Sequence, residues 1–390
     1  MKDIFKHIVA EDKLHPVFEL LREHLPIEPA KLLIEEITAE MPDNDGNFIQ
    51  QFQTTGFHSR LWEIFLFKFF KENGFTFNDA HNRPDFHVAK NGIDFHVEAS
   101  LSSEVDGDKF TKEYILKAQK NNDLAVQKEL IDHYVIRMGS VLYSKLQKKY
   151  WELDWVKGKP LVLAITPAHN YLASFLPDAK IIEYLYGLAY EADSTTEGLI
   201  PKKVKQVKVH TYGEKEIPAN FFSLPDTENI SAVIFSNNSD LHKFNRMGYQ
   251  GGLSDLTIIM ERAGLAFDLT PNAHPVEFSQ SIIPGDIKED WNEGVSIFHN
   301  PNAKIPLEKG LFQNIREAWI NEDGDLDGRM PKFFPFSSKT FPVAIGKKAS
   351  NSNLNPTWLE RCLFKILETF PKSTKAIIWM LNKLDKFKSL

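Results

Sequence analysis

A two-residue turn, Asn91 and Gly92, separates two short runs in which apolar and polar residues alternate. The runs are PDFHVAK, residues 84 to 90, and IDFHVEAS, residues 93 to 100. Asn-Gly between such runs is the strongest short-range signal for an antiparallel hairpin, because a type I′ turn needs positive φ at both positions. This hairpin constrains the fold more than any other segment, since the turn sets the register of both strands.

The register of the hairpin decides which side chains share a face. The residues next to the turn face each other, and counting back from them places Asp85 opposite Glu98. Successive side chains point to opposite faces of a strand. The apolar face carries Phe86, Val88, Phe95 and Val97, and the polar face carries Asp85, His87, Asp94, His96 and Glu98. We expect the apolar face to pack into the core.

The segments around the hairpin predict an α/β fold. SRLWEIFLFKFFKENG predicts a helix that begins with Ser59 as N-cap and ends at Gly74, and its apolar circumference predicts burial. A charged helical stretch from residue 103 to 128 and an apolar-periodic helix from 129 to 151 follow. PLVLAIT, residues 160 to 166, is a continuous apolar run typical of a central strand buried on both faces.

Chain length and the flanking patterns suggest three regions. Residues 1–50 read as an N-terminal helical appendage, with helices at 14–25 and 28–40. Residues 51–200 hold the predicted core and a helix at 178–190. Residues 201–390 read as a C-terminal α+β extension, with strands near 203–211, 231–236 and 256–260 and a final helical pair at 356–369 and 373–387.

Composition excludes several classes of protein. The formal net charge of −7 argues against a chain coated in positive charge, so a nucleic-acid partner would need a local basic rim. No apolar run is long enough to cross a bilayer, and the N-terminus lacks a signal-peptide pattern, so we expect a cytoplasmic protein without a membrane partner. The single cysteine, Cys362, excludes an internal disulfide and a cysteine-rich zinc site. Walker, HExxH and GxSxG motifs are absent.

The opposed carboxylates Asp85 and Glu98 carry the predicted chemistry. Directly opposite residues have Cβ atoms about 4.5 to 5.5 Å apart, and two like charges at that distance destabilise a sheet unless something positive lies between them. A hard divalent cation resolves this conflict. Mg²⁺ is held by one or two protein carboxylates with waters and phosphate oxygens, so it can polarise a phosphodiester and activate a water.

Glu63 interrupts the apolar surface of the helix that precedes the hairpin. A carboxylate there must be paired, hydrogen-bonded or bound to a metal. Arg60, one turn earlier, offers an ion pair as the alternative to a metal role.

From residue 60 to 166 the chain resembles the PD-(D/E)xK, or restriction-endonuclease-like, nuclease superfamily. The matching features are a helix with a glutamate (Glu63), a strand that opens with Pro84 and Asp85, and a second strand that ends in an acidic-x-polar triplet from Glu98 to Ser100. The resemblance implies an α-β-β-β-α-β core with a mixed sheet, whose first strand is TFNDAH, residues 76 to 81. It also implies Asp85 and Glu98 as metal ligands, Glu63 as an auxiliary acid at the metal, and Mg²⁺ or Mn²⁺ as the cofactor.

The sequence departs from this family at Ser100, where members normally carry a lysine. That lysine orients the attacking water and stabilises negative charge, which serine cannot do. Lys145, on the apolar stripe of the helix at 129–151, is a candidate substitute. If it acts so, its ammonium must reach Asp85 and Glu98; the alternative is that its stem covers the core while its head snorkels to water.

Three functions compete. The first is a Mg²⁺-dependent DNA endonuclease, acting in restriction, repair or defence, with Glu63, Asp85, Glu98, Ser100 and Lys145 as site residues. The second is a catalytically inactive nuclease fold that binds nucleic acid or protein. The third is a metal hydrolase of a small substrate, in which His87 and His96 join the two carboxylates. A homodimer is left open.

Overall fold

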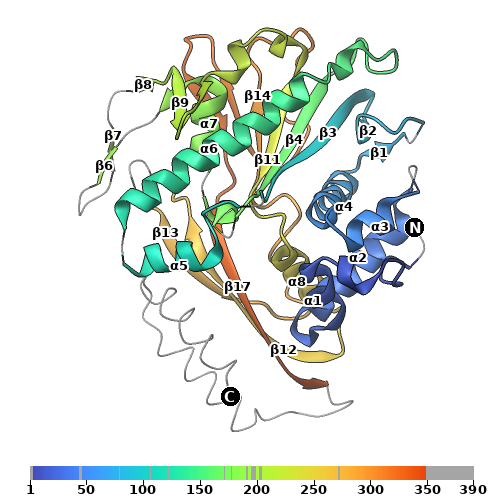
Figure 1. Ribbon diagram of the computed structural model, residues 1–390. Coiled ribbons are helices and arrows are strands. Elements are labelled where there is room, and N and C mark those ends of the chain that lie inside the picture. The colour runs from blue at the N-terminus through green and yellow to red at the C-terminus, as the bar shows by residue number, and fades with distance from the viewer. Residues whose placement is uncertain are drawn as a thin grey trace.

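The computed structural model describes residues 3–347, apart from 44–45, 79, 106, 122, 171, 177, 190–191, 195–198, 202–203 and 271–272. The predicted helical pair at 356–369 and 373–387, and Cys362, lie outside these residues. The described part is a mixed α/β fold in which helices cover both faces of one large sheet (Figure 1). No described helix is both long enough and apolar enough to span a membrane.

The large sheet has eight strands. In spatial order they are β1 (Thr76–Phe77), β2 (Phe86–Lys90), β3 (Ile93–Ser103), β4 (Leu161–Ala168), β11 (Ala232–Ser236), β14 (Val295–His299), β15 (Arg316–Ile320) and β16 (Leu326–Arg329). Strands β1, β2 and β3 form an antiparallel meander, and β4 then pairs parallel to β3. Strand β11 is parallel to β4 and antiparallel to β14. The expectation of an α/β fold with a mixed sheet is therefore confirmed.

The hairpin has the predicted turn and register. Asn91 has a φ of 53° and Gly92 a φ of 83°, as a type I′ turn requires. The ladder pairs His87 with His96 and Lys90 with Ile93. The predicted apolar face is buried; its residues are Phe86, Val88, Phe95 and Val97. The first strand is shorter than expected, because β1 ends at Phe77 rather than near residue 81.

Helix α4 (Phe57–Glu72) packs on one face of this sheet, and its burial was predicted correctly. Trp62 is buried there and donates from Nε1 to the carbonyl of Ala164 in β4 over 3.3 Å. The predicted N-cap, Ser59, was wrong: the N-cap is Gly56, three residues earlier, and the helix begins at Phe57. The same core includes residues of α1 (Pro16–Glu23), α2 (Glu28–Glu40), α3 (Phe48–Gln53) and α8 (Leu241–Gln250).

Helix α6 (Leu124–Leu146) packs on the opposite face together with α7 (Ala179–Tyr186), while the short α5 (Lys112–Lys120) precedes it. The predicted span of 129 to 151 was displaced at both ends. Asp123 caps the start by accepting from two backbone N–H groups. At the other end Lys149 has a φ of 50°, which turns the chain into the 3-10 helix η3 (Tyr150–Glu152). This change of direction at Lys149 brings Tyr150 to Glu98 of β3.

The part of the chain expected as a C-terminal extension shares the large sheet, since β11 pairs directly with β4. A separate three-stranded sheet joins β13 (Val276–Ser281), β12 (Leu256–Ala266) and β17 (Pro335–Lys347). Short two-stranded pairs are β9 (Val209–Tyr212) with β10 (Lys215–Pro218), β5 (Leu188–Ala189) with β8 (Lys205–Gln206), and β6 (Ala192–Ser194) with β7 (Leu199–Pro201). Remaining 3-10 turns are η1 (Glu11–Lys13), η2 (Leu25–Ile27), η4 (Ala173–Phe175), η5 (Phe221–Ser223) and η6 (Thr227–Asn229).

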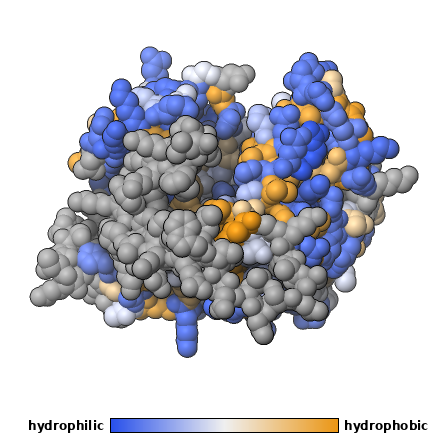
Figure 2. Space-filling model, turned by 90° about the horizontal axis from the view of Figure 1, so that it is seen from below, coloured by the Kyte–Doolittle hydropathy of each residue, from blue (hydrophilic) through white to orange (hydrophobic). Residues whose placement is uncertain are grey.

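Seen from below, the coloured surface is mainly hydrophilic, with hydrophobic residues near the middle of the view (Figure 2).

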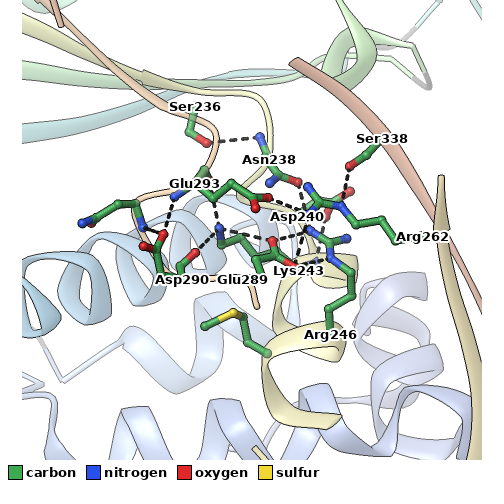
Figure 3. A network of polar contacts seen from close by, with 12 residues as sticks. Ser236, Asn238, Asp240, Lys243, Arg246, Arg262, Glu289, Asp290, Glu293 and Ser338 are labelled. Carbon is green, nitrogen blue, oxygen red and sulfur yellow. Dashed lines mark hydrogen bonds and ion pairs between the residues drawn. The ribbon is translucent and has the colours of Figure 1, made fainter. Parts of the chain in front are cut away.

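A buried ion network ties α8 to β12 and to the segment at 286–294 (Figure 3). Glu289 is its centre: Arg246 holds both carboxylate oxygens, at 2.6 and 2.8 Å, and Lys243 Nζ lies 3.3 Å away. Arg262 Nη1 lies 2.6 Å from Glu293. Burial alone would raise the pKa of Glu289, but Arg246, Arg262 and Lys243 outweigh it and lower that pKa. The network therefore joins α8, β12 and the segment that precedes β14.

Candidate functional site

The two opposed carboxylates lie where β2 begins beside the middle of β3. Phe86 pairs with Val97, so the next position outward sets Asp85 beside Glu98. Asp85 Oδ2 accepts a hydrogen bond of 2.7 Å from the backbone N–H of Ala99. The Asp85 carboxylate is therefore fixed against the strand that carries Glu98.

Glu98 is held by two side chains from the opposite layer. Lys145 Nζ lies 2.5 Å from Glu98 Oε1, and the Tyr150 hydroxyl donates to the same oxygen over 3.0 Å. The Glu98 side chain is 4% exposed and that of Lys145 is 28% exposed. Lys145 is thus partly open to solvent and also contacts a buried carboxylate. A residue that substitutes for the motif lysine must place its ammonium beside Glu98, and Lys145 does so.

Tyr150 is a site residue that the sequence did not reveal. The helical pattern continues through Lys148, so Tyr150 was placed inside a helix, whereas the left-handed backbone at Lys149 turns it toward Glu98. Burial, then the charge of Glu98 and its hydrogen bond, raise the pKa of the Tyr150 phenol. The hydroxyl consequently stays protonated at neutral pH and can donate.

Asp85 has an unusual electrostatic environment. Asp85 is an exposed residue. The protein atoms packed around its carboxylate, followed by the negative charges of Glu98 and Glu63, raise the pKa of Asp85 well above its ordinary value; the Ala99 N–H and Lys145 act in the opposite direction. A cation bound beside Asp85 would relieve that repulsion.

Glu63 projects from α4 and is paired within its own helix. Arg60 Nη1 lies 2.5 Å from Glu63 Oε2, so the ion pair considered from the sequence is present. Arg60 also donates to Gln51 and Asn47, which fixes it in place. Glu63 therefore contributes negative charge near Asp85 while Arg60 holds its carboxylate.

Ser100 lies two residues beyond Glu98 on β3, paired with Ile165 of β4. It is 6% exposed, and its hydroxyl has no hydrogen-bond partner among the described residues. Within the described structure the Ser100 hydroxyl makes no hydrogen bond to either carboxylate, so the position of the motif lysine holds a small buried side chain.

His87 and His96 stack on each other, with ring centroids 4.2 Å apart, but each is already engaged. His96 Nε2 lies 3.0 Å from the carbonyl oxygen of Trp155, and His87 Nε2 lies 2.8 Å from Asp94. Burial lowers the pKa of His96 to about 4. The Nε2 atoms of both rings thus already have partners within the protein, which argues against a two-histidine metal site.

An open hollow lies against Asp85, whereas Glu98 and Lys145 do not line it. Its walls include Glu63 and Asp85, the amide side chains of Asn47, Asn78 and Asn82, the ring of His81, and residues 41–43 that precede α3. The segment expected as an appendage therefore helps to build the site.

The donor set fits a hard divalent cation at a minimal site of two carboxylates. Among the described residues, no three histidine, cysteine, aspartate or glutamate side chains are arranged to hold a metal ion. Asp85 and Glu98 are thus the candidate ligands, and Glu63 acts at longer range through its charge.

Comparison with known proteins gave no match to a family model, a curated protein or a solved structure. The candidate site therefore rests on its own geometry.

Proposed function

We propose that this protein is a metal-dependent nuclease that hydrolyses phosphodiester bonds in DNA, with a restriction-endonuclease-like core formed by α4, β1, β2, β3, α6 and β4. The observation that carries the proposal is the meeting of Asp85, Glu98 and Lys145, with Asp85 lining an open hollow. The order of elements and the parallel pairing of β4 with β3 support the core. Restriction, repair and defence are roles compatible with this reaction.

A Mg²⁺ or Mn²⁺ ion held by Asp85 and Glu98 would polarise the phosphodiester and lower the pKa of a bound water. Lys145 lies beside Glu98 and is partly open to solvent, so it can orient the attacking water and stabilise negative charge on the phosphoryl oxygens. Tyr150 keeps Glu98 in position by donating to it. Arg60 keeps Glu63 in position in the same way.

The alternative is a nuclease fold that only binds. Ser100 motivates it, because the residue that normally supplies the positive charge is missing and the buried Glu98 is already neutralised by Lys145. On that reading the Lys145–Glu98 pair is a structural ion pair, and nucleic acid binds without being cut.

Cleavage assays separate these functions. We expect plasmid DNA to be cut with Mg²⁺ or Mn²⁺, not with EDTA, and not by the Asp85→Asn or Glu98→Gln variants. Binding without cleavage under every ion would favour the inactive module. Tight zinc binding without affinity for DNA would favour the small-substrate hydrolase. An Asp94→Asn variant, altered in the same hairpin but outside the site, is the matched control.

A further inference from the structure

The rim of the hollow carries a preformed pair of stacked rings. His81, in the loop before β2, lies on the indole of Trp155, with centroids 4.1 Å apart and planes inclined by 11°. His81 is exposed and lines the hollow, whereas Trp155 is partly buried behind it. One face of the imidazole is thus covered by Trp155, and the exposed residue borders the hollow.

Trp155 is fixed by two hydrogen bonds. Its Nε1 donates to the carbonyl of Arg83 over 2.8 Å, and its own carbonyl oxygen lies 3.0 Å from His96 Nε2. The indole therefore gives His81 a rigid support. Because the His81–Trp155 pair is stacked before a ligand binds, less conformational entropy is lost when a ligand stacks on His81.

The wall next to these rings is polar in a way that suits a nucleobase. Asn82, between His81 and the site, is exposed and makes no hydrogen bond with the described residues. Asn78 uses its Oδ1 to accept from Ala80, and its amide group also lines the hollow. Amide side chains present both donors and acceptors, as the edges of bases require. Asp85 lies in the same wall.

We propose that the hollow takes one unpaired nucleotide of the nucleic-acid strand, with its base stacked on His81 and its phosphate directed to a cation held at Asp85 and Glu98. The proposal rests on the proposed nuclease function for the role of the phosphate. It identifies the substrate class as a strand with at least one unstacked nucleotide: a single strand, a bulge or a flipped base. A continuous paired duplex cannot place a base in the hollow without extruding it.

Binding of short oligonucleotides tests this idea without cleavage. With Ca²⁺ in place of Mg²⁺, so that a cation can lie at the carboxylates, fluorescence anisotropy of the full chain is measured on a fluorescein-labelled single strand, on the same strand in a duplex, and on that duplex with one bulged nucleotide. We expect the single strand and the bulge to bind more tightly than the paired duplex. Loss of one base stack in His81→Ala should weaken single-strand binding by roughly 5- to 150-fold. His81→Phe should retain binding, as should His242→Ala, which alters an exposed histidine on α8 away from the hollow.

A second readout uses the unaltered protein, so it holds even where a variant fails to fold. A 2-aminopurine placed in the strand should lose fluorescence when it stacks on His81. Preference for the paired duplex, unchanged affinity of a folded His81→Ala, or no quenching of 2-aminopurine would each overturn the proposal. An RNA version of the same strand tells whether the sugar matters.

The same strands, incubated with Mg²⁺, distinguish the two proposals. Binding that depends on His81 without any cleavage would refute the nuclease while leaving the stacking site intact. Cleavage that is lost in Asp85→Asn but indifferent to His81 would support the nuclease and refute the stacking site.

Discussion

Lys145 Nζ lies 2.5 Å from Glu98 Oε1, although the two residues belong to α6 and β3 on either side of a long connection. In this arrangement a helix supplies the positive charge that the neighbouring strand position, Ser100, does not. The Lys145 side chain therefore neutralises a buried carboxylate, and its exposed part can contact a water or a phosphate.

The first prediction concerns Lys145→Met. Removing the ammonium should abolish cleavage. It should also destabilise the metal-free protein by about 1 to 3 kcal/mol, because Glu98 loses its charged partner and retains only Tyr150. Lys145→Arg keeps the charge and should recover most of the stability. Denaturant unfolding and plasmid cleavage measure the two effects; full activity in a folded Lys145→Met would remove the lysine from the mechanism.

The second prediction concerns Asp85→Asn. Because the folded-state pKa of Asp85 is raised, the native protein binds more protons than the unfolded chain above the ordinary value of 3.8, and its stability falls as pH rises through that window. The metal-free variant should therefore melt at the same temperature as the parent or higher at neutral pH. It should also lose stabilisation by Mg²⁺. Thermal melts across pH, with and without Mg²⁺, measure both effects.

Asp94→Asn is the control for this experiment. The hydrogen bond from Lys159 lowers the pKa of Asp94, so the sign is reversed, and removing this half-exposed partner should cost about 0 to 1 kcal/mol. The Mg²⁺ response should survive in Asp94→Asn. If instead Asp85→Asn strongly destabilises the apo protein and stays active, Asp85 serves the fold and not the chemistry.

The hairpin was predictable because its determinants are local. Asn91 and Gly92 define the turn, and the turn fixes which side chain faces which. The start of α4 was missed by three residues, since Ser59 has the chemistry of an N-cap but Gly56 occupies the position. Tyr150 was missed because nothing in its neighbours signals the left-handed backbone at Lys149.

Features that join distant segments were not predictable from local pattern. The pairing of β11 with β4 extends the sheet across a boundary drawn near residue 200, and strand pairing between remote segments leaves no periodic signal. The buried charges of α8 illustrate the same limit. Lys243 and Arg246 look like residues of a solvated helix face until Glu289 is brought against them.

The third prediction addresses this ion network. Glu289→Gln leaves Lys243, Arg246 and Arg262 buried around a neutral side chain, which should cost about 3 to 5 kcal/mol of unfolding free energy. Lys288→Gln, at the adjacent and exposed position, should change stability by no more than about 0.5 kcal/mol. Urea unfolding of both variants measures the difference. Equal stability of Glu289→Gln and the parent would show that the Glu289 charge contributes nothing to the stability of the fold.

The last prediction concerns the acid side of the stability curve. His169 is 2% exposed, and its Nδ1 lies 2.6 Å from the Ser102 hydroxyl while Nε2 has no partner among the described residues. Burial, then the neighbouring His133 and Arg137, lower the pKa of His169 to about 3 from an ordinary value of 6.5. Folded His169 therefore stays neutral when the unfolded chain takes up a proton.

Because of His169, the free energy of unfolding should decrease as pH falls from 6.5 toward about 3. The slope of this decrease should approach about 1.4 kcal/mol per pH unit. His169→Asn retains a polar group near the position of Nδ1 but cannot titrate. Its stability at neutral pH should be lower than that of the parent, because the smaller side chain leaves a void, yet its curve should fall less steeply with acid. Unfolding free energies measured across this range decide the matter. Parallel curves for the two proteins would mean that His169 takes up its proton equally in the folded and unfolded states, and that its burial does not hold the ring neutral.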